Sequence, residues 1–278
     1  MKRRWLSMSR KILSSPYIIW AVAFIILPLF MVLYYGCTTE SGAFTLSNIT
    51  AVMDPVHLKA FGNSVWIALA STLICLVISY PLAYILSKGN QRGSGFVVML
   101  FILPMWINFL LRVLALQVIL SKTGILNSLL SILGLPAQKL MYTKGGILIG
   151  MVYDYIPFMI LPIYNALCKI DKNVIEAAHD LGAGTCETLR KIILPLSFPG
   201  VLSGIIMVFI PSISEFVVAD ILGGSKILLF GNIIDQEFNT ANNWNLGSGL
   251  SVVLMIFIFI SMAVMNRNSS EEGDTMLW

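Results

Sequence analysis

Residues 176–195 read EAAHDLGAGTCETLRKIILP, and long apolar segments flank this charged stretch on both sides. Hydrophobic residues make up 57% of the 278-residue chain and charged residues 12%, against roughly 25% charged residues in soluble domains. This composition is that of a membrane protein. The quoted stretch is therefore expected to lie outside the membrane, between two segments that cross it.

The stretch has the pattern of two short helices joined at a glycine. Asn173 is expected to cap the first helix, with Glu176 as its third residue. That helix is expected to stop at Gly182, because glycine adopts the left-handed conformation that closes a helix at little cost. The second helix is expected to start after Thr185 and to end before Pro195. Such a loop is typical of a plug that docks on a soluble protein, and the alternative is an ordinary interfacial helix.

Apolar stretches outside this loop are long enough to cross a bilayer, which needs about 20 residues per helix. We expect an all-α, polytopic membrane protein with six transmembrane helices. The membrane-spanning core would cover residues 17–265 with the loop at 169–195, between an N-terminal segment at 1–16 and a disordered tail at 266–278. The expected spans are 17–35, 64–86, 96–120, 145–167, 198–219 and 247–265.

Basic residues indicate the orientation of these spans. With the N-terminus inside the cell, 12 of the 18 Lys and Arg residues lie in inner segments, as the positive-inside rule requires. Both termini and the 169–195 loop are therefore expected to be cytoplasmic. The net charge of +4 follows from this topology, and we expect no nucleic-acid partner. The four cysteines have no metal-ligand spacing, so no metal site is expected.

Three ionisable residues lie inside the expected spans, where charge is costly and usually functional. They are Arg112 in the third span, Asp154 in the fourth and Glu215 in the fifth. Asn108 precedes Arg112 by four residues, which would place both on one helix face. Asp220 follows the fifth span, near its expected outer mouth.

A surplus of carboxylates along a pathway favours a cationic cargo, since the carboxylates replace the water that the cargo leaves behind. Trp106 and Tyr153 could add aromatic faces for an amine. The alternative, which the sequence leaves open, is a structural salt bridge between Arg112 and either Asp154 or Glu215.

The 176–195 stretch resembles the "EAA" loop of the inner-membrane permeases of ABC importers. The pattern is E-A-A, three residues, G, nine residues and then I-x-L-P, and all of its fixed positions match. They are Glu176, Ala177, Ala178, Gly182, Ile192, Leu194 and Pro195.

The resemblance implies a type I importer permease whose loop is a coupling helix for a cytoplasmic ATPase subunit. The chain contains no G-x-x-x-x-G-K-[ST] phosphate loop, so it is expected not to be an enzyme. ATP and Mg would be bound by the partner ATPase, and this chain would bind no cofactor.

Four segments are similar to the polyamine (spermidine/putrescine) branch of that family, to the first of its two permease subunits. This similarity implies a second permease subunit, two ATPase copies and an external polyamine-binding protein, in a bacterial inner membrane. The segments are LPMWINFLLRVLALQVILSKTGILN (103–127), GMVYDYIPFMILPIYNAL (150–167), EAAHDLGAG (176–184) and VVADILGGSKILLFGNII (217–234).

Two alternatives remain open from the residues. The same architecture could import an anion with the help of Arg112 and Lys122, or ferric iron or an opine. A proton-coupled secondary carrier is the other possibility, in which Asp154 or Glu215 would relay the proton.

Overall fold

The computed structural model describes residues 16–17, 19–89 and 91–275. These residues form helices and loops without a named β-strand, and they include six segments long and apolar enough to cross a membrane. An all-α, six-span protein is therefore confirmed. The six segments are Ile19–Gly36, Pro55–Lys88, Phe109–Ile132, Lys144–Cys168, Thr185–Ser214 and Trp244–Met265.

The chain divides into two compact units. The first comprises 1–58 and 233–257 and the second 59–232 and 258–278. In the first unit, Gly36 at the end of α2 lies against the backbone of Ser248 and Gly249 in α13, and Asn245 Nδ2 donates to the Thr38 carbonyl oxygen at 2.7 Å. The helical elements of this unit are η1 (Val22–Ile26), α2 (Leu27–Gly36), α3 (Ser47–Thr50), η2 (Ala51–Met53) and parts of α4, α12 (Phe230–Asn239) and α13 (Trp244–Thr275).

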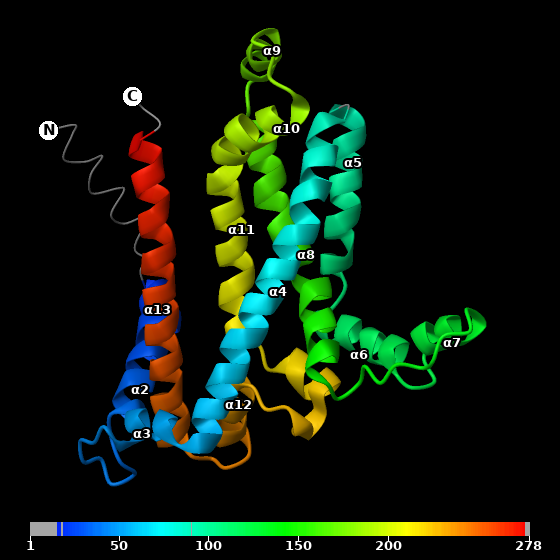
Figure 1. The fold of residues 1–278 in the computed structure, drawn as a ribbon. Coiled ribbons are helices and arrows are strands. Elements are labelled where there is room, and N and C mark those ends of the chain that lie inside the picture. The colour runs from blue at the N-terminus through cyan, green and yellow to red at the C-terminus, as the bar shows by residue number, and fades with distance from the viewer. Residues whose placement is uncertain (1–15, 18, 90, 276–278) are drawn as a thin grey trace, which may run out of the picture. The chain divides into compact units, whose positions relative to one another are not determined.

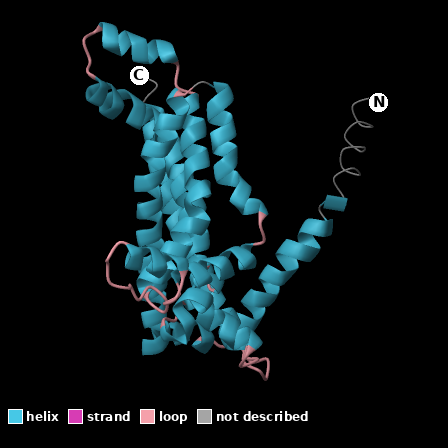
Figure 2. Cartoon of the chain, turned by 90° about the vertical axis from the view of Figure 1, so that its right-hand side faces the viewer, coloured by secondary structure: helices cyan, strands magenta, loops and turns pink. Residues whose placement is uncertain are grey.

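The second unit holds the candidate functional residues (Figure 1). Its long helices α4 (Pro55–Lys88), α8 (Lys144–Cys168) and α11 (Leu194–Ser214) run alongside one another in both views (Figures 1 and 2). The shorter elements are α5 (Gln91–Ile102), η3 (Leu103–Trp106), α6 (Phe109–Leu120), α7 (Ile125–Ile132), α9 (Lys172–Asp180), α10 (Thr185–Thr188), η4 (Leu189–Ile193), η5 (Ala219–Gly223) and η6 (Gly224–Lys226).

Helices α8 and α11 approach each other closely at two glycines of α11. A Cβ on Gly200 would lie 2.4 Å from the Ala166 Cβ of α8, and one on Gly204 would lie 2.7 Å from the Met159 sulfur. Small residues four positions apart let two membrane helices pack backbone to backbone.

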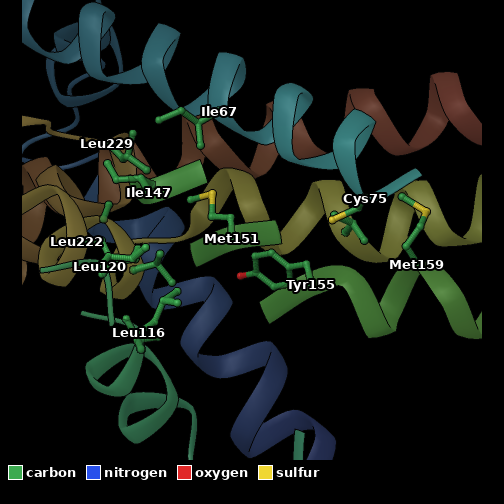
Figure 3. Packing of buried hydrophobic residues seen from close by; sticks show 14 of the residues in the cluster. Ile67, Cys75, Leu116, Leu120, Ile147, Met151, Tyr155, Met159, Leu222 and Leu229 are labelled. Atoms are coloured by element: carbon green, nitrogen blue, oxygen red, sulfur yellow. The ribbon is translucent and has the colours of Figure 1, made fainter. Parts of the chain in front are cut away.

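The core of this unit lines one face of α8. Met151, Tyr155 and Met159 are spaced by four residues and share that face, and they lie beside Ile67 and Cys75 of α4 (Figure 3). Met151 and Met159 are fully buried and Tyr155 is 7% exposed. This packing fixes the turn of α8 that contains Asp154 and Tyr155.

The expected continuous span over 96–120 is wrong. Helix α5 ends at Ile102, η3 ends at Trp106, and α6 starts at Phe109 and runs across the direction of α5 (Figure 1). Pro104 lacks a backbone N–H, and the Asn108 side chain accepts from the N–H groups of Leu110 and Leu111, which starts a new helix.

The expected span over 198–219 is also interrupted. Helix α11 ends at Ser214, and Glu215 is extended with φ −66° and ψ 131°. A further helical segment follows and includes η5. The break arises because the Glu215 side chain caps that segment by accepting the N–H groups of Val217 and Val218.

The tail differs from expectation as well. Helix α13 continues to Thr275, whereas the composition predicts disorder from residue 266. Residues 266–275 contain no proline that would end the helix. Residues 1–15 of the expected N-terminal segment and 276–278 of the tail lie outside the described residues.

Candidate functional site

The 169–195 loop projects beyond the ends of α8 and α11 in both views, with α9 as its outermost helix (Figures 1 and 2). Asp171 caps α9, since its Oδ1 accepts the Asn173 N–H at 3.0 Å. The expectation that Asn173 is the cap is wrong. The helix starts two residues earlier, because the Asp171 carboxylate accepts both the backbone N–H and the side-chain amide of Asn173.

The end of α9 agrees with the sequence prediction. Gly182 has φ +84° and donates its N–H to the His179 carbonyl at 2.9 Å, while Ala183 donates to the Ala178 carbonyl at 3.0 Å. These two bonds are the glycine-terminated helix cap, which satisfies carbonyls that have no partner within the helix. The backbone of any residue other than glycine would be strained at position 182.

The second helix of the loop does not end before Pro195. Helix α10 is continuous with a π-helical turn, η4, and then with α11, where Pro195 lies in the first turn. Proline is tolerated there because the surrounding turn has the wider hydrogen-bond pattern. Ile193 is 3% exposed and anchors the loop in the core.

Between α9 and the second helix lies a groove of about 520 Å³. Ala177, Ala178 and Ile192 line it, together with Val174 and Leu181. Leu181 is 89% exposed and is not among the residues that the sequence predicted to be functional. The signal that could have found it is a large apolar residue directly before a helix-ending glycine in a polar loop.

The family motif is divided between two sides of the loop. Glu176 lines a second cavity of about 300 Å³ with Lys88 and Lys172, whereas Ala177 and Ala178 line the 520 Å³ groove. Leu194 is 42% exposed. The groove is thus the apolar side of the loop, and Glu176 lies on the side toward the end of α4.

A second candidate site is a cluster of buried polar residues around Asp154 and Tyr155 of α8. Asp154 is ten residues from the first residue of α8, Lys144, which is about 15 Å along the helix at 1.5 Å per residue. A bilayer core is roughly 30 Å thick, so this depth lies within the hydrocarbon region.

Arg112 and Asp154 form an ion pair between α6 and α8. Arg112 Nε lies 3.0 Å from Asp154 Oδ1, with side chains that are 10% and 1% exposed. Arg112 Nη1 also donates to the Pro104 carbonyl oxygen at 3.2 Å. Of the alternatives that the sequence leaves open, the structure therefore contains the bridge from Arg112 to Asp154.

Glu215 has a different set of partners. Its Oε2 accepts the Tyr155 hydroxyl at 2.6 Å, and its Oε1 accepts the N–H groups of Val217 and Val218 at 2.9 and 3.2 Å. Both carboxylate oxygens are thus occupied by donors. Glu215 joins the break after α11 to the residue next to Asp154.

The remaining pathway candidates lie on the surface of the second unit. Trp106 is 80% exposed and Tyr153 43% exposed, and Asn108 and Asp220 are also exposed. The expectation that Asn108 lies on a helix face with Arg112 is wrong, because Asn108 precedes α6 and caps it. Asp220 lies in η5 and donates its backbone N–H to the Phe216 carbonyl at 2.8 Å.

Lys122 lines a cavity of about 640 Å³, together with Lys139 and Tyr142. Arg112, the other residue that could bind an anion, is paired with Asp154.

No group of three or more His, Cys, Asp and Glu residues that could hold a metal ion occurs among the described residues.

Residues 79–269 match the family model of the binding-protein-dependent transport system inner membrane component. The chain belongs to this family. A transport-system membrane component agrees with the six apolar segments, and membership favours an importer permease over a secondary carrier.

Two relatives share the description spermidine/putrescine transport system permease protein PotB. The Haemophilus influenzae protein is 37% identical over 253 residues, covering 87% of this chain and 88% of the relative. The Escherichia coli K12 protein is 37% identical over 258 residues, covering 90% and 94%. The similarity thus runs over nearly the whole length of both proteins.

Solved structures share the fold. A chain of a bacterial ABC transporter for the import of alginate aligns with a TM-score of 0.78 and 16% identity. The alignment covers 96% of this chain and 96% of that chain. The alginate transporter in complex with its pentasaccharide-bound periplasmic protein reaches 0.81 at 17% identity, covering 96% and 95%. The observed architecture is therefore that of an ABC importer permease.

Proposed function

We propose that this chain is one of two permease subunits of an ATP-driven importer that moves polyamines such as putrescine and spermidine into the cytoplasm. The observation that carries the proposal is the similarity to two spermidine/putrescine permeases at 37% identity over about nine-tenths of the chain. The permease changes access from one side of the membrane to the other and performs no covalent chemistry.

The projecting loop is the contact with the ATPase subunits, which bind ATP and Mg. An exposed apolar groove in a protein that buries its other apolar surface in lipid calls for a protein partner. Leu181 would supply the apolar anchor, since large side chains that fill a partner pocket dominate interface energies. Gly182 and Asp171 hold α9 in the geometry that presents this groove.

The interrupted spans support a second permease subunit. Irregular backbone at membrane depth is tolerated only against protein or a water-filled cavity, and Trp106, Ile107 and Asn108 are exposed around one such break. A second permease, with the cavity that forms between the two subunits, would cover this surface. An external polyamine-binding protein would deliver the cargo to the outer loops.

The positive-inside rule supports an orientation with both termini in the cytoplasm, and the family description supports the bacterial inner membrane. A membrane-impermeant reagent added to spheroplasts should label a cysteine that replaces Lys226 in η6. It should not label a cysteine that replaces Asp180 in α9. Labelling of Asp180→Cys from outside would contradict this orientation.

The test of the function is uptake by the purified complex in proteoliposomes loaded with ATP and Mg. The expected result is accumulation of labelled putrescine or spermidine that requires the external binding protein and persists when the proton gradient is collapsed. Accumulation of an anion, ferric iron or an opine in place of either polyamine would contradict the proposed cargo. Accumulation that needs the proton gradient and not ATP would contradict the mechanism.

A further inference from the structure

The two buried acids differ in how fully their oxygens are used. Glu215 accepts three hydrogen bonds, from Tyr155, Val217 and Val218. Neither oxygen of Asp154 has a hydrogen-bond partner within the described part of the chain, although the side chain is only 1% exposed. Buried carboxylate oxygens are normally satisfied, so Asp154 retains acceptor capacity that Glu215 lacks.

The contact with Arg112 uses little of that capacity. Strong arginine–carboxylate pairs are bidentate, with two aligned N–H groups. Here Arg112 Nε lies 3.0 Å from Asp154 Oδ1, but neither Nε nor either carboxylate oxygen has a hydrogen-bond partner within the described part of the chain. Nη1 is directed to the Pro104 carbonyl oxygen. The pair neutralises both charges but leaves the oxygens open to better donors.

We propose that Asp154 binds an ammonium group of the cargo during translocation, and that Arg112 is the resident cation that neutralises this carboxylate while the pathway is empty. This inference rests on the proposed polyamine import. An unpaired carboxylate at this depth would be costly. Exchange of one cation for another avoids that cost, because the carboxylate keeps a positive partner throughout.

Arg112 has contacts that it can keep when cargo takes its place. The Pro104 carbonyl oxygen holds Nη1 at 3.2 Å, and the Phe109 ring centroid lies 5.8 Å from the guanidinium carbon, within reach of a cation–π contact. Arg112 and Phe109 belong to α6, which is joined to η3 through the non-helical residues 107–108. Movement at this junction would withdraw the guanidinium from α8 and open Asp154 to the cargo.

An ammonium group suits the vacated carboxylate. It has three donors in a compact head and can approach both Asp154 oxygens, neither of which accepts a hydrogen bond from the guanidinium. A neutral analogue of the cargo would lack the charge needed to replace Arg112. The site thus selects for a cation through competition with a cation of the protein itself.

A neutral pair separates this role from a structural salt bridge. Removing one partner of a buried ion pair is strongly destabilising, whereas replacing both by neutral groups is often tolerated. Uptake of labelled putrescine would be measured in proteoliposomes that contain the whole importer with Arg112→Gln/Asp154→Asn. We expect the variant complex to assemble and its KM for putrescine to rise at least tenfold, because the amine has lost its carboxylate.

Wild-type KM in the assembled neutral variant would overturn the exchange and leave a structural bridge. Ser197→Ala is the control, since it removes a fully buried polar group near the start of α11 that contacts the Tyr80 hydroxyl and belongs to neither candidate site, and its KM should stay within twofold of wild type. Failure of the wild-type complex to accumulate any polyamine would instead refute the proposed function.

A measurement on the wild-type complex covers the case in which the neutral variant does not assemble. A diamine that carries a photoactivatable diazirine would be illuminated during turnover, and the adducts would be located by mass spectrometry. We expect adducts on the α8 peptide around Asp154 that are suppressed by excess putrescine. Adducts confined to other segments would overturn the exchange.

Discussion

Asp154 and Tyr155 are consecutive residues of α8, and each holds a different interrupted span. Asp154 pairs with Arg112 at the start of α6, and Tyr155 donates to Glu215 after the end of α11. One turn of α8 thus fixes two helix breaks at the same depth. Movement of α8 relative to either neighbour would strain one of these contacts, which connects the buried cluster with a change of access.

Removing the cap at Glu215 should destabilise the protein. In Glu215→Ala the N–H groups of Val217 and Val218 and the Tyr155 hydroxyl lose their acceptor, at a cost of about 1–3 kcal/mol for buried groups left unpaired. Tyr155→Phe removes a donor only and should cost about 1 kcal/mol. Thermal unfolding in detergent would measure both. A Tyr155→Phe loss larger than that of Glu215→Ala would contradict the capping role.

Asp171 and Asn173 lie two residues apart at the start of α9, and only Asp171 caps the helix. Asp171→Ala should lower the local stability of α9 by about 1 kcal/mol, as loss of an N-cap does. Asn173→Ala removes a side chain that only donates to Asp171 and should change little. Hydrogen exchange of the α9 amides reports the difference, and equal protection loss in the two variants would count against Asp171 as the cap.

Close packing of α8 and α11 predicts that substitutions of Gly200 and Gly62 change the stability in opposite directions. Gly200→Val should destabilise by about 1–3 kcal/mol or more because of overpacking, since its Cβ would meet Ala166 Cβ and the Pro162 carbonyl. Gly62→Ala, in α4 with open space around the new Cβ, should instead stabilise by roughly 0.5–1 kcal/mol. Melting temperatures in detergent test both signs, and a neutral Gly200→Val would show that the helices can separate freely.

The exposed groove predicts a specific loss of assembly. Leu181→Asp places a charge on an apolar side chain that is 89% exposed, so the protein should fold normally but retain at least tenfold less ATPase subunit on co-purification. Cys186→Asp is the matched control, because Cys186 is exposed in α10 and does not line the groove. Normal ATPase recovery with Leu181→Asp would move the docking surface elsewhere.

Much of this architecture could be predicted from the sequence because it depends on local signals. Apolar length indicated the six spans, and Gly182 marked the end of α9 through its backbone freedom. The breaks at Asn108 and Glu215 were missed because both lie inside uniformly apolar stretches. In such stretches a polar residue that caps a new helix has the same letter pattern as one that lines a pathway.

Partner choice was beyond the sequence for a different reason. Arg112 could have paired with either acid, since the three residues are far apart in the chain. Only the packing of α6 and α8 brings it to Asp154, while the backbone turn at Glu215 occupies the other acid. Leu181 was missed because its role depends on exposure, which an apolar letter does not reveal.

Nucleotide turnover in a partner subunit is proposed to drive this permease through α9. The most direct measurement is crosslinking of Leu181→Cys to cysteines in the ATPase subunit, in a chain whose exposed Cys168 and Cys186 are replaced by serine. We expect a crosslink in the importing complex, with uptake that stops on crosslinking and returns on reduction. A complex that imports polyamine while position 181 stays free of crosslinks to the ATPase would contradict this proposal.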